Sequence, residues 1–149
     1  MVHYGLDLGA KPGSIVRAPE AMEVLAFAVN DKTKPLTGYG PAAILAKGAS
    51  GVYHVIGHMD AWGWSGDDRA LLPWIGRTYV EGEVIGTVSK LNHVHWEVRT
   101  VALPARGADR AALTLDPRAW LRGDREPLPS GGGGIAVLLL LYLLTWGSR

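Results

Sequence analysis

Short runs of β-branched and apolar residues, separated by glycine, proline, asparagine and aspartate, make up most of the first 121 positions of the chain. Runs of this length bounded by turn-forming residues are typical of β-strands. The pattern predicts strands over residues 16–19, 22–29, 42–47, 52–58, 84–88 and 94–101. Within these 121 positions it predicts helix only over two short segments, residues 70–74 and 117–121. The chain is therefore expected to form an all-β domain.

The composition is that of a folded domain without a strongly basic surface. Of the 149 residues, 48% are hydrophobic and 19% are charged, which is too apolar for a disordered chain. Fifteen lysines and arginines against 14 acidic residues leave a net charge of +1, so nucleic acid is not an expected partner. The absence of cysteine excludes disulfide scaffolds, thiolate metal sites and cysteine nucleophiles.

The last 28 residues differ in character from this domain. Residues 122–134 combine prolines, alternating charges and five glycines, as in a flexible connector. Residues 135–149 are predicted to form a hydrophobic helix, and the 12 positions from Ile135 to Trp146 carry no charge. Twelve apolar residues are fewer than the ~20 of an ordinary bilayer span. A short membrane anchor and a helix buried in a protein assembly both remain open, and the folded domain is placed at residues 1–121.

Histidines carry the candidate chemistry. In the sequence NHVHWEVR, at residues 92–99, strand alternation places His93, His95 and Glu97 on one face and the apolar residues between them on the other. The apolar face is expected to pack on the core, so that two histidines are held side by side on a rigid strand. Such a pair suits a metal site, but it also occurs in proteins that bind no metal.

His3 and Asp7 form a second candidate pair. On a straight strand they would lie about 13 Å apart, too far to share an ion that sits ~2 Å from each ligand. Gly5 and Gly9 permit the bend that a shared ion requires. Combined with the His-x-His pair, the segment supplies two histidines and one carboxylate, a set suited to zinc with an open fourth position. A solvated pair near the terminus is the alternative.

Taken in order, these segments resemble the lysostaphin-type zinc endopeptidases, which cut peptidoglycan cross-links. The matching stretches are HYGLDL (3–8), GSIVRAP (13–19), GHM (57–59), GEVIG (82–86), HVHWEVR (93–99) and DPRAWL (116–121). Each motif is weak alone, but their ordered succession is specific. The resemblance implies a compact antiparallel β domain, a barrel-sandwich hybrid, over residues 1–121.

The resemblance also implies the roles of individual residues. Zinc would be bound by His3, Asp7 and His95, and His58 and His93 would form the catalytic pair. One imidazole would accept a proton from water and the other would donate to the developing oxyanion, with the assignment left open. Glu97 either orients a ligand imidazole or is an ordinary solvated or salt-bridged glutamate.

Two positions on the strand predicted at residues 52–58 depart from the family pattern or add to it. Ile56 stands where the family usually has a tyrosine. His54 shares the strand parity of Ile56 and His58, so it is expected either to line the same cleft or to lie on the surface without a role.

The expected function is that of a zinc endopeptidase that cleaves peptide cross-links of bacterial peptidoglycan. The five intact metal and catalytic positions favour this over a non-catalytic structural or wall-binding module. No signal-peptide pattern opens the chain, and an apolar segment closes it. This combination suits a bacteriophage virion protein, held in an internal membrane or a tail through residues 135–146, and a tail-anchored hydrolase of the cell envelope is the alternative.

Overall fold

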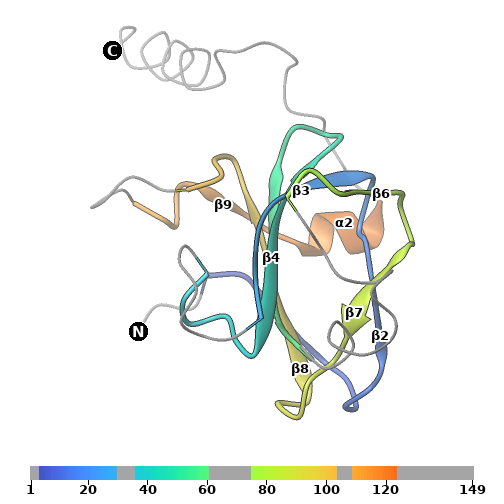
Figure 1. Ribbon diagram of the computed structural model, residues 1–149. Coiled ribbons are helices and arrows are strands. Elements are labelled where there is room, and N and C mark those ends of the chain that lie inside the picture. Colours follow the sequence, from blue (N-terminus) through green and yellow to red (C-terminus); the bar gives the residue numbers. More distant parts are fainter. Residues whose placement is uncertain (1–3, 30–35, 61–74, 104–108, 124–149) are drawn as a thin grey trace, which may run out of the picture.

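The computed structural model describes residues 4–29, 36–60, 75–103 and 109–123 (Figure 1). The elements, in chain order, are β1 (Leu6–Gly9), β2 (Ile15–Arg17), β3 (Met22–Ala28), β4 (Ala42–Gly48), β5 (Tyr53–Met59), β6 (Thr78–Tyr79), β7 (Val84–Thr87), β8 (His93–Arg99), β9 (Thr114–Leu115) and the helix α2 (Arg118–Arg122). The described part of the chain thus consists of antiparallel strands and one short helix, and the all-β prediction is confirmed.

The strands form two sheets. The large sheet has the order β1-β8-β5-β4-β3-β6, with β9 also paired to β8, and the small sheet pairs β2 with β7. In Figure 1, β2, β7 and α2 lie to the right of β4, whereas residues 36–41, which lead into β4, lie to its left. Over the described residues the large sheet is open, since β1 and β6 end its order, and it does not close into a barrel.

The hydrophobic pattern located the longer elements well. The predicted runs coincide with β2, β3, β4, β5, β7 and β8, and the predicted segment 117–121 coincides with α2. The pattern did not predict β1, β6 or β9, and the last two, with two residues each, are too short to produce it. Residues 70–74, the connector at 124–134 and the segment 135–149 lie outside the described residues. Within the described residues, no helix is long and apolar enough to cross a membrane.

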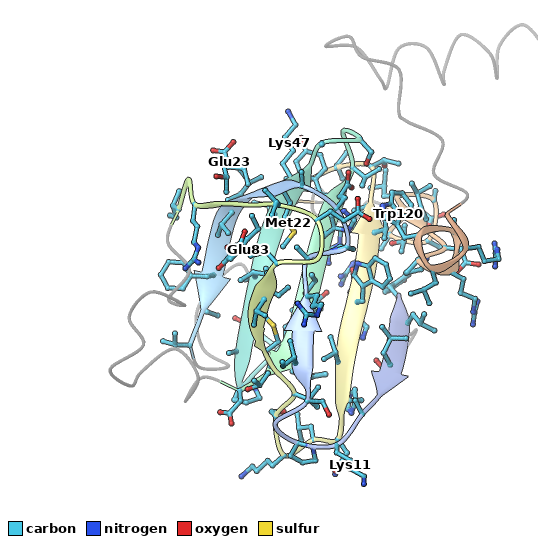
Figure 2. All side chains as sticks on the ribbon, turned by 90° about the vertical axis from the view of Figure 1, so that its right-hand side faces the viewer. Lys11, Met22, Glu23, Lys47, Glu83 and Trp120 are labelled. Carbon is cyan, nitrogen blue, oxygen red and sulfur yellow. The ribbon has the colours of Figure 1, made fainter. Side chains whose placement is uncertain are left out.

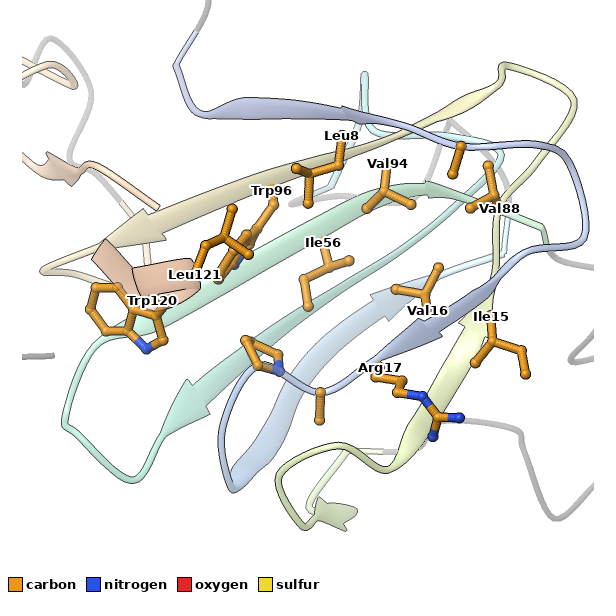
Figure 3. Close-up of a pocket in the computed structure, with 13 residues that line it drawn as sticks. Leu8, Ile15, Val16, Arg17, Ile56, Val88, Val94, Trp96, Trp120 and Leu121 are labelled. Carbon is orange, nitrogen blue, oxygen red and sulfur yellow. The ribbon is translucent and has the colours of Figure 1, made fainter. Parts of the chain in front are cut away.

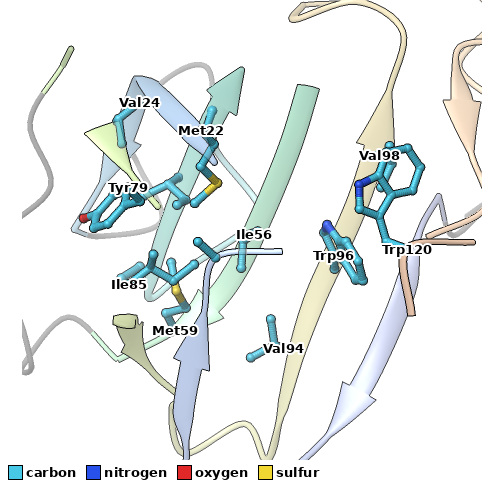
Figure 4. Close-up of a cluster of buried hydrophobic side chains, with 14 of the residues drawn as sticks. Met22, Val24, Ile56, Met59, Tyr79, Ile85, Val94, Trp96, Val98 and Trp120 are labelled. Atoms are coloured by element: carbon cyan, nitrogen blue, oxygen red, sulfur yellow. The ribbon is translucent and has the colours of Figure 1, made fainter. Parts of the chain in front are cut away.

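The main core fills the space between the two sheets (Figure 4). Val94, Trp96 and Val98 of β8 all face it, as strand alternation predicts. Figure 2 shows the small sheet in front of the large one, with Lys11 at one end of the molecule and Glu23 and Lys47 at the other. A cavity of about 430 Å³ lies in the same layer, and its lining includes Leu8, Ile56, Val94 and Trp96 (Figure 3). The cavity is therefore on the face of β8 opposite His93 and His95.

A buried polar cluster beside this core contains His54, contrary to both expectations for that residue. His54 is 0% exposed. The indole N–H of Trp96 donates to its Nδ1 at 3.2 Å, so Nε2 carries the proton and donates to Oε1 of Glu20 at 2.6 Å. Ser50 donates to Glu20 through both its backbone N–H and its hydroxyl. Burial opposes ionisation of Glu20, but these hydrogen bonds outweigh it and lower its pKa to about 2.

Candidate functional site

Strand register brings the candidate ligands together on the other face of the large sheet. β8 lies between β1 and β5, and His95 is directly opposite Asp7 on one side and Gly57 on the other. Directly opposite residues project to the same face of a sheet. Gly5, just before β1, has a φ of 115°, a conformation that favours glycine. His3 lies outside the described residues, so the bend between His3 and Asp7 stays a prediction.

Asp7 and His95 contact each other directly. Oδ1 of Asp7 lies 2.9 Å from Nδ1 of His95, and Nε2 of the same ring lies 3.0 Å from Oε1 of Glu97. Burial alone would lower the pKa of His95, but the hydrogen bonds to Glu97 and Asp7 outweigh burial and raise it. The ring therefore sits between two carboxylates, a position that favours a proton or a metal ion beside it.

Glu97 is the residue that fixes this ring. It is 2% exposed and therefore not solvated, and it makes both of the other expected contacts: one with the ring of His95 and a salt bridge with Arg99. Its Oε1 accepts from His95 and from the hydroxyl of Tyr39, and its Oε2 accepts from Nε of Arg99 at 2.7 Å. Burial opposes its ionisation, but the hydrogen bonds from His95 and Tyr39 and the charge of Arg99 outweigh burial and lower the pKa of Glu97. An ionised Glu97 accepts a hydrogen bond from the Nε2–H group of His95, and Nδ1 of the ring is left facing Asp7.

His58 and His93 lie beside this pair, and their rings contact each other. The ring centroids are 4.8 Å apart, with the planes at 71°. Nδ1 of His58 lies 2.5 Å from the carbonyl oxygen of Gly40, and Nδ1 of His93 lies 2.8 Å from that of Leu91. Because a carbonyl oxygen only accepts hydrogen bonds, each ring carries its proton on Nδ1 and presents the lone pair of Nε2. In His93 this Nε2 lies 4.0 Å from Oδ2 of Asp7.

His58 reaches this face only because the end of β5 departs from strand alternation. His58 has a φ of 60°, in the left-handed region. Ile56 and Met59, three positions apart, both face the main core, so one residue between them is out of phase. The predicted shared face of His54 and His58 is therefore wrong, because this irregularity turns His58 to the side of His93 and His95.

The donor set fits a zinc ion as far as the structure describes it. Among the described residues no group of three potential ligands is found, and His3, the third expected ligand, lies outside them. Asp7 and His95 nevertheless supply a carboxylate oxygen and an imidazole Nδ1 directed at one another, with the other imidazole nitrogen bound to a carboxylate. Protein zinc sites commonly have this carboxylate–histidine support.

Three residues behind His95 were not predicted from the sequence: Tyr39, Arg99 and Arg110. The hydroxyl of Tyr39 accepts from Nη2 of Arg99 at 2.8 Å and from Nη2 of Arg110 at 2.9 Å. The guanidinium of Arg110 also lies over the ring of Tyr4, 4.9 Å from its centroid. These contacts join positions about 60 or more residues apart, and no local spacing in the sequence indicates them.

Comparisons with solved structures define the fold class. The chain is similar to CbpA from L. salivarius REN, with 20% identity and a TM-score of 0.58 over 81% of this chain and 74% of that one. It is also similar to the catalytic domain of the antimicrobial peptidase lysostaphin from Staphylococcus simulans, with 18% identity and a TM-score of 0.58 over 81% and 80% of the two chains. No family model and no curated protein matches the chain. The predicted lysostaphin-like β fold is confirmed at the level of the fold.

Proposed function

We propose that the protein is a zinc-dependent endopeptidase that cleaves peptide cross-links of bacterial peptidoglycan. One observation carries the proposal: Asp7, His58, His93 and His95, four of the five expected positions, meet on one face of the large sheet. His58 takes part only through an irregular strand end with a left-handed φ. Costly backbone conformations of this kind cluster at functional sites. The fold shared with a lysostaphin catalytic domain supports the same proposal.

The residues fit two different tasks. Asp7 and His95, with His3, would hold zinc, which when bound supplies a Lewis acid that activates water and polarises the scissile carbonyl. Glu97 accepts a hydrogen bond from Nε2–H of His95. The proton stays on Nε2, and Nδ1 is left as the ligand atom. This arrangement fixes the orientation of one ligand ring before metal arrives.

His58 and His93 would move protons. Each ring is oriented by a backbone carbonyl at Nδ1 and presents Nε2 to the site. One Nε2 accepts a proton from the attacking water, and the other, when protonated, donates to the oxyanion that forms on the peptide. Their equivalent anchoring makes either ring competent for either role.

Digestion of purified peptidoglycan, followed by mass spectrometry of the fragments, tests this function and identifies the bond. The wild-type protein is expected to convert cross-linked fragments into uncross-linked ones with new amino and carboxyl ends. His93→Ala is expected to lower this conversion about a hundredfold or more. Unchanged cross-links in the presence of folded, zinc-loaded wild-type protein would refute the proposal.

We further propose that residues 135–146 attach the enzyme to a membrane or to a protein assembly of a bacteriophage virion, from which it opens the cell wall locally. The proposal is supported by the sequence of the segment, which has no charge over 12 residues. Burial of a large apolar side chain is worth about 1.5–3 kcal/mol, so such a segment is strongly favoured to leave water.

A further inference from the structure

The loop that leads into β4 contacts the candidate site at several points, although its sequence, Gly-Tyr-Gly-Pro at residues 38–41, indicated only a turn. The backbone N–H of His58 donates to the carbonyl oxygen of Tyr39 at 2.8 Å. Nδ1 of the same histidine donates to the carbonyl oxygen of Gly40. A Cβ added to Gly57 would lie 2.9 Å from Cβ of Tyr39, so the loop packs tightly on β5. The backbone of Tyr39 is thus fixed against the site.

The hydrogen bonds of the Tyr39 hydroxyl can be assigned in only one way. A phenol has one proton to donate and two lone pairs to accept with. Arg99 and Arg110 each donate to the oxygen, at 2.8 and 2.9 Å. The proton is therefore directed to the remaining partner, Oε1 of Glu97, at 2.6 Å.

That carboxylate oxygen is the same one that accepts from Nε2 of His95. The two donors constrain Glu97 from different sides, since Tyr39 comes from the loop and His95 from β8. The ring of Tyr39 also lies against the imidazole of His95, with centroids 5.5 Å apart. Without the hydroxyl, Oε1 would keep only one of its two donors, while Arg99 would continue to hold Oε2.

We propose that Tyr39 is a positioning residue for His95: its hydroxyl holds Oε1 of Glu97 against Nε2 of the imidazole, so that Nδ1 stays directed at Asp7. The effect of Tyr39 on metal binding and turnover rests on the proposed function. Its effect on the orientation of the His95 ring is expected in the metal-free protein as well.

The substitution Tyr39→Phe isolates the hydroxyl from the ring. Phenylalanine keeps the ring packing against Gly57 and His95 and removes only the hydrogen bond to Glu97. Tyr53→Phe is the matched control, because Tyr39 and Tyr53 pack against the same smaller cluster of buried residues, formed by Ala28, Leu36, Ala43, Leu45 and Val55. If the Tyr39 hydroxyl had only a structural role, Tyr39→Phe and Tyr53→Phe would have similar effects on His95 and on zinc binding.

Nitrogen-15 NMR of the histidine side chains, recorded on metal-free full-length protein, shows which ring nitrogens carry a hydrogen-bonded proton. In the wild-type protein and in Tyr53→Phe, a hydrogen-bonded proton is expected on Nε2 of His95 and on Nδ1 of His58. In Tyr39→Phe, the Nε2–H signal of His95 is expected to shift and broaden as its hydrogen bond to Glu97 loosens, while the signals of His58 stay in place. Unchanged His95 signals in a folded Tyr39→Phe protein would overturn the proposal.

Competition with a chelator of known zinc affinity supplies the second readout. Loss of residues that orient a ligand typically weakens metal binding 10- to 100-fold, and we expect about tenfold for Tyr39→Phe. Tyr53→Phe is expected to bind zinc as the wild-type protein does. Equal zinc affinity in all three proteins would overturn the positioning role, whereas a wild-type protein that binds no zinc would refute the proposed function and leave the NMR result to decide the inference.

Discussion

Nε2 of His95 lies 3.0 Å from Oε1 of Glu97, two residues further along the same strand. Residues two apart on a strand share a face, so this contact follows directly from the local sequence. It holds a proton on Nε2, so Nδ1, 2.9 Å from Asp7, is the nitrogen of His95 that a metal could take. The carboxylate is in turn held by groups from other parts of the chain.

Replacing Glu97 by glutamine is expected to weaken both metal binding and the fold. The amide would place N–H groups against the donors of Arg99 and Tyr39, and the charge of Arg99 would lose its buried partner. We expect zinc affinity to fall 10- to 100-fold and the free energy of unfolding to fall by about 3 kcal/mol. Chelator competition and urea unfolding measure the two effects.

Glu23→Gln is the control for this substitution, because Glu23 is an exposed residue on β3. It should change neither zinc affinity nor, beyond about 0.5 kcal/mol, stability. If Glu97→Gln behaved like this control, Glu97 would not orient the ligand.

Gly5 is expected to tolerate no side chain. Its φ is 115°, and an added Cβ would lie 2.7 Å from Cγ of Glu97 and from the carbonyl oxygen of Trp96. Gly5→Ala should therefore cost about 2 kcal/mol or more of stability and displace the segment that carries Asp7. Gly9→Ala is the matched control on β1, where an added Cβ meets nothing within 4 Å. Similar thermal unfolding midpoints for the two variants would contradict this account of the bend.

The Glu20–His54 pair predicts a specific loss of stability in acid. The pKa of Glu20 is about 2 in the folded protein against an ordinary value of 4.5, so its contribution is complete above pH 4.5 and is lost as the pH falls toward 2. The contribution amounts to about 3 kcal/mol. The difference in unfolding free energy between wild type and Glu20→Gln should be largest near pH 7 and should shrink below pH 4.5. A difference that stays constant from pH 7 to pH 3 would show that Glu20 is not held ionised by its partners.

The sequence predicts the parts of the site that depend on neighbours in the chain. Strand alternation correctly placed His93, His95 and Glu97 on one face and Trp96 in the core. The same rule failed for His54 and His58, because the left-handed residue at the end of β5 breaks the alternation that it assumes.

Partners distant in the chain were beyond sequence reasoning for a different reason. Glu20 meets His54 across 34 positions, and Tyr39 meets Glu97 across 58. Such contacts arise when strands far apart in the sequence pair within one sheet, and neither residue type nor spacing marks them in a single sequence.

Removal of the apolar segment tests its proposed role in attachment. The protein truncated after Ser130 should be soluble and should still hydrolyse peptidoglycan, since α2 ends at Arg122, well before the cut. Full-length protein should float with liposomes in a density gradient, and the truncated protein should stay at the bottom. If both forms stayed at the bottom and the full-length protein were monodisperse, the membrane attachment would be refuted in favour of assembly with protein.

The most direct test of the central claim follows cross-link cleavage while zinc is returned to chelator-treated protein. For the wild-type protein, cleavage should be absent without metal and should rise with added zinc until about one ion is bound per chain. His93→Ala should bind the same amount of zinc and remain at least about a hundredfold slower, whereas Asp7→Ala should recover neither zinc nor activity. Full cleavage by metal-free wild-type protein, or full zinc occupancy in Asp7→Ala, would contradict the account.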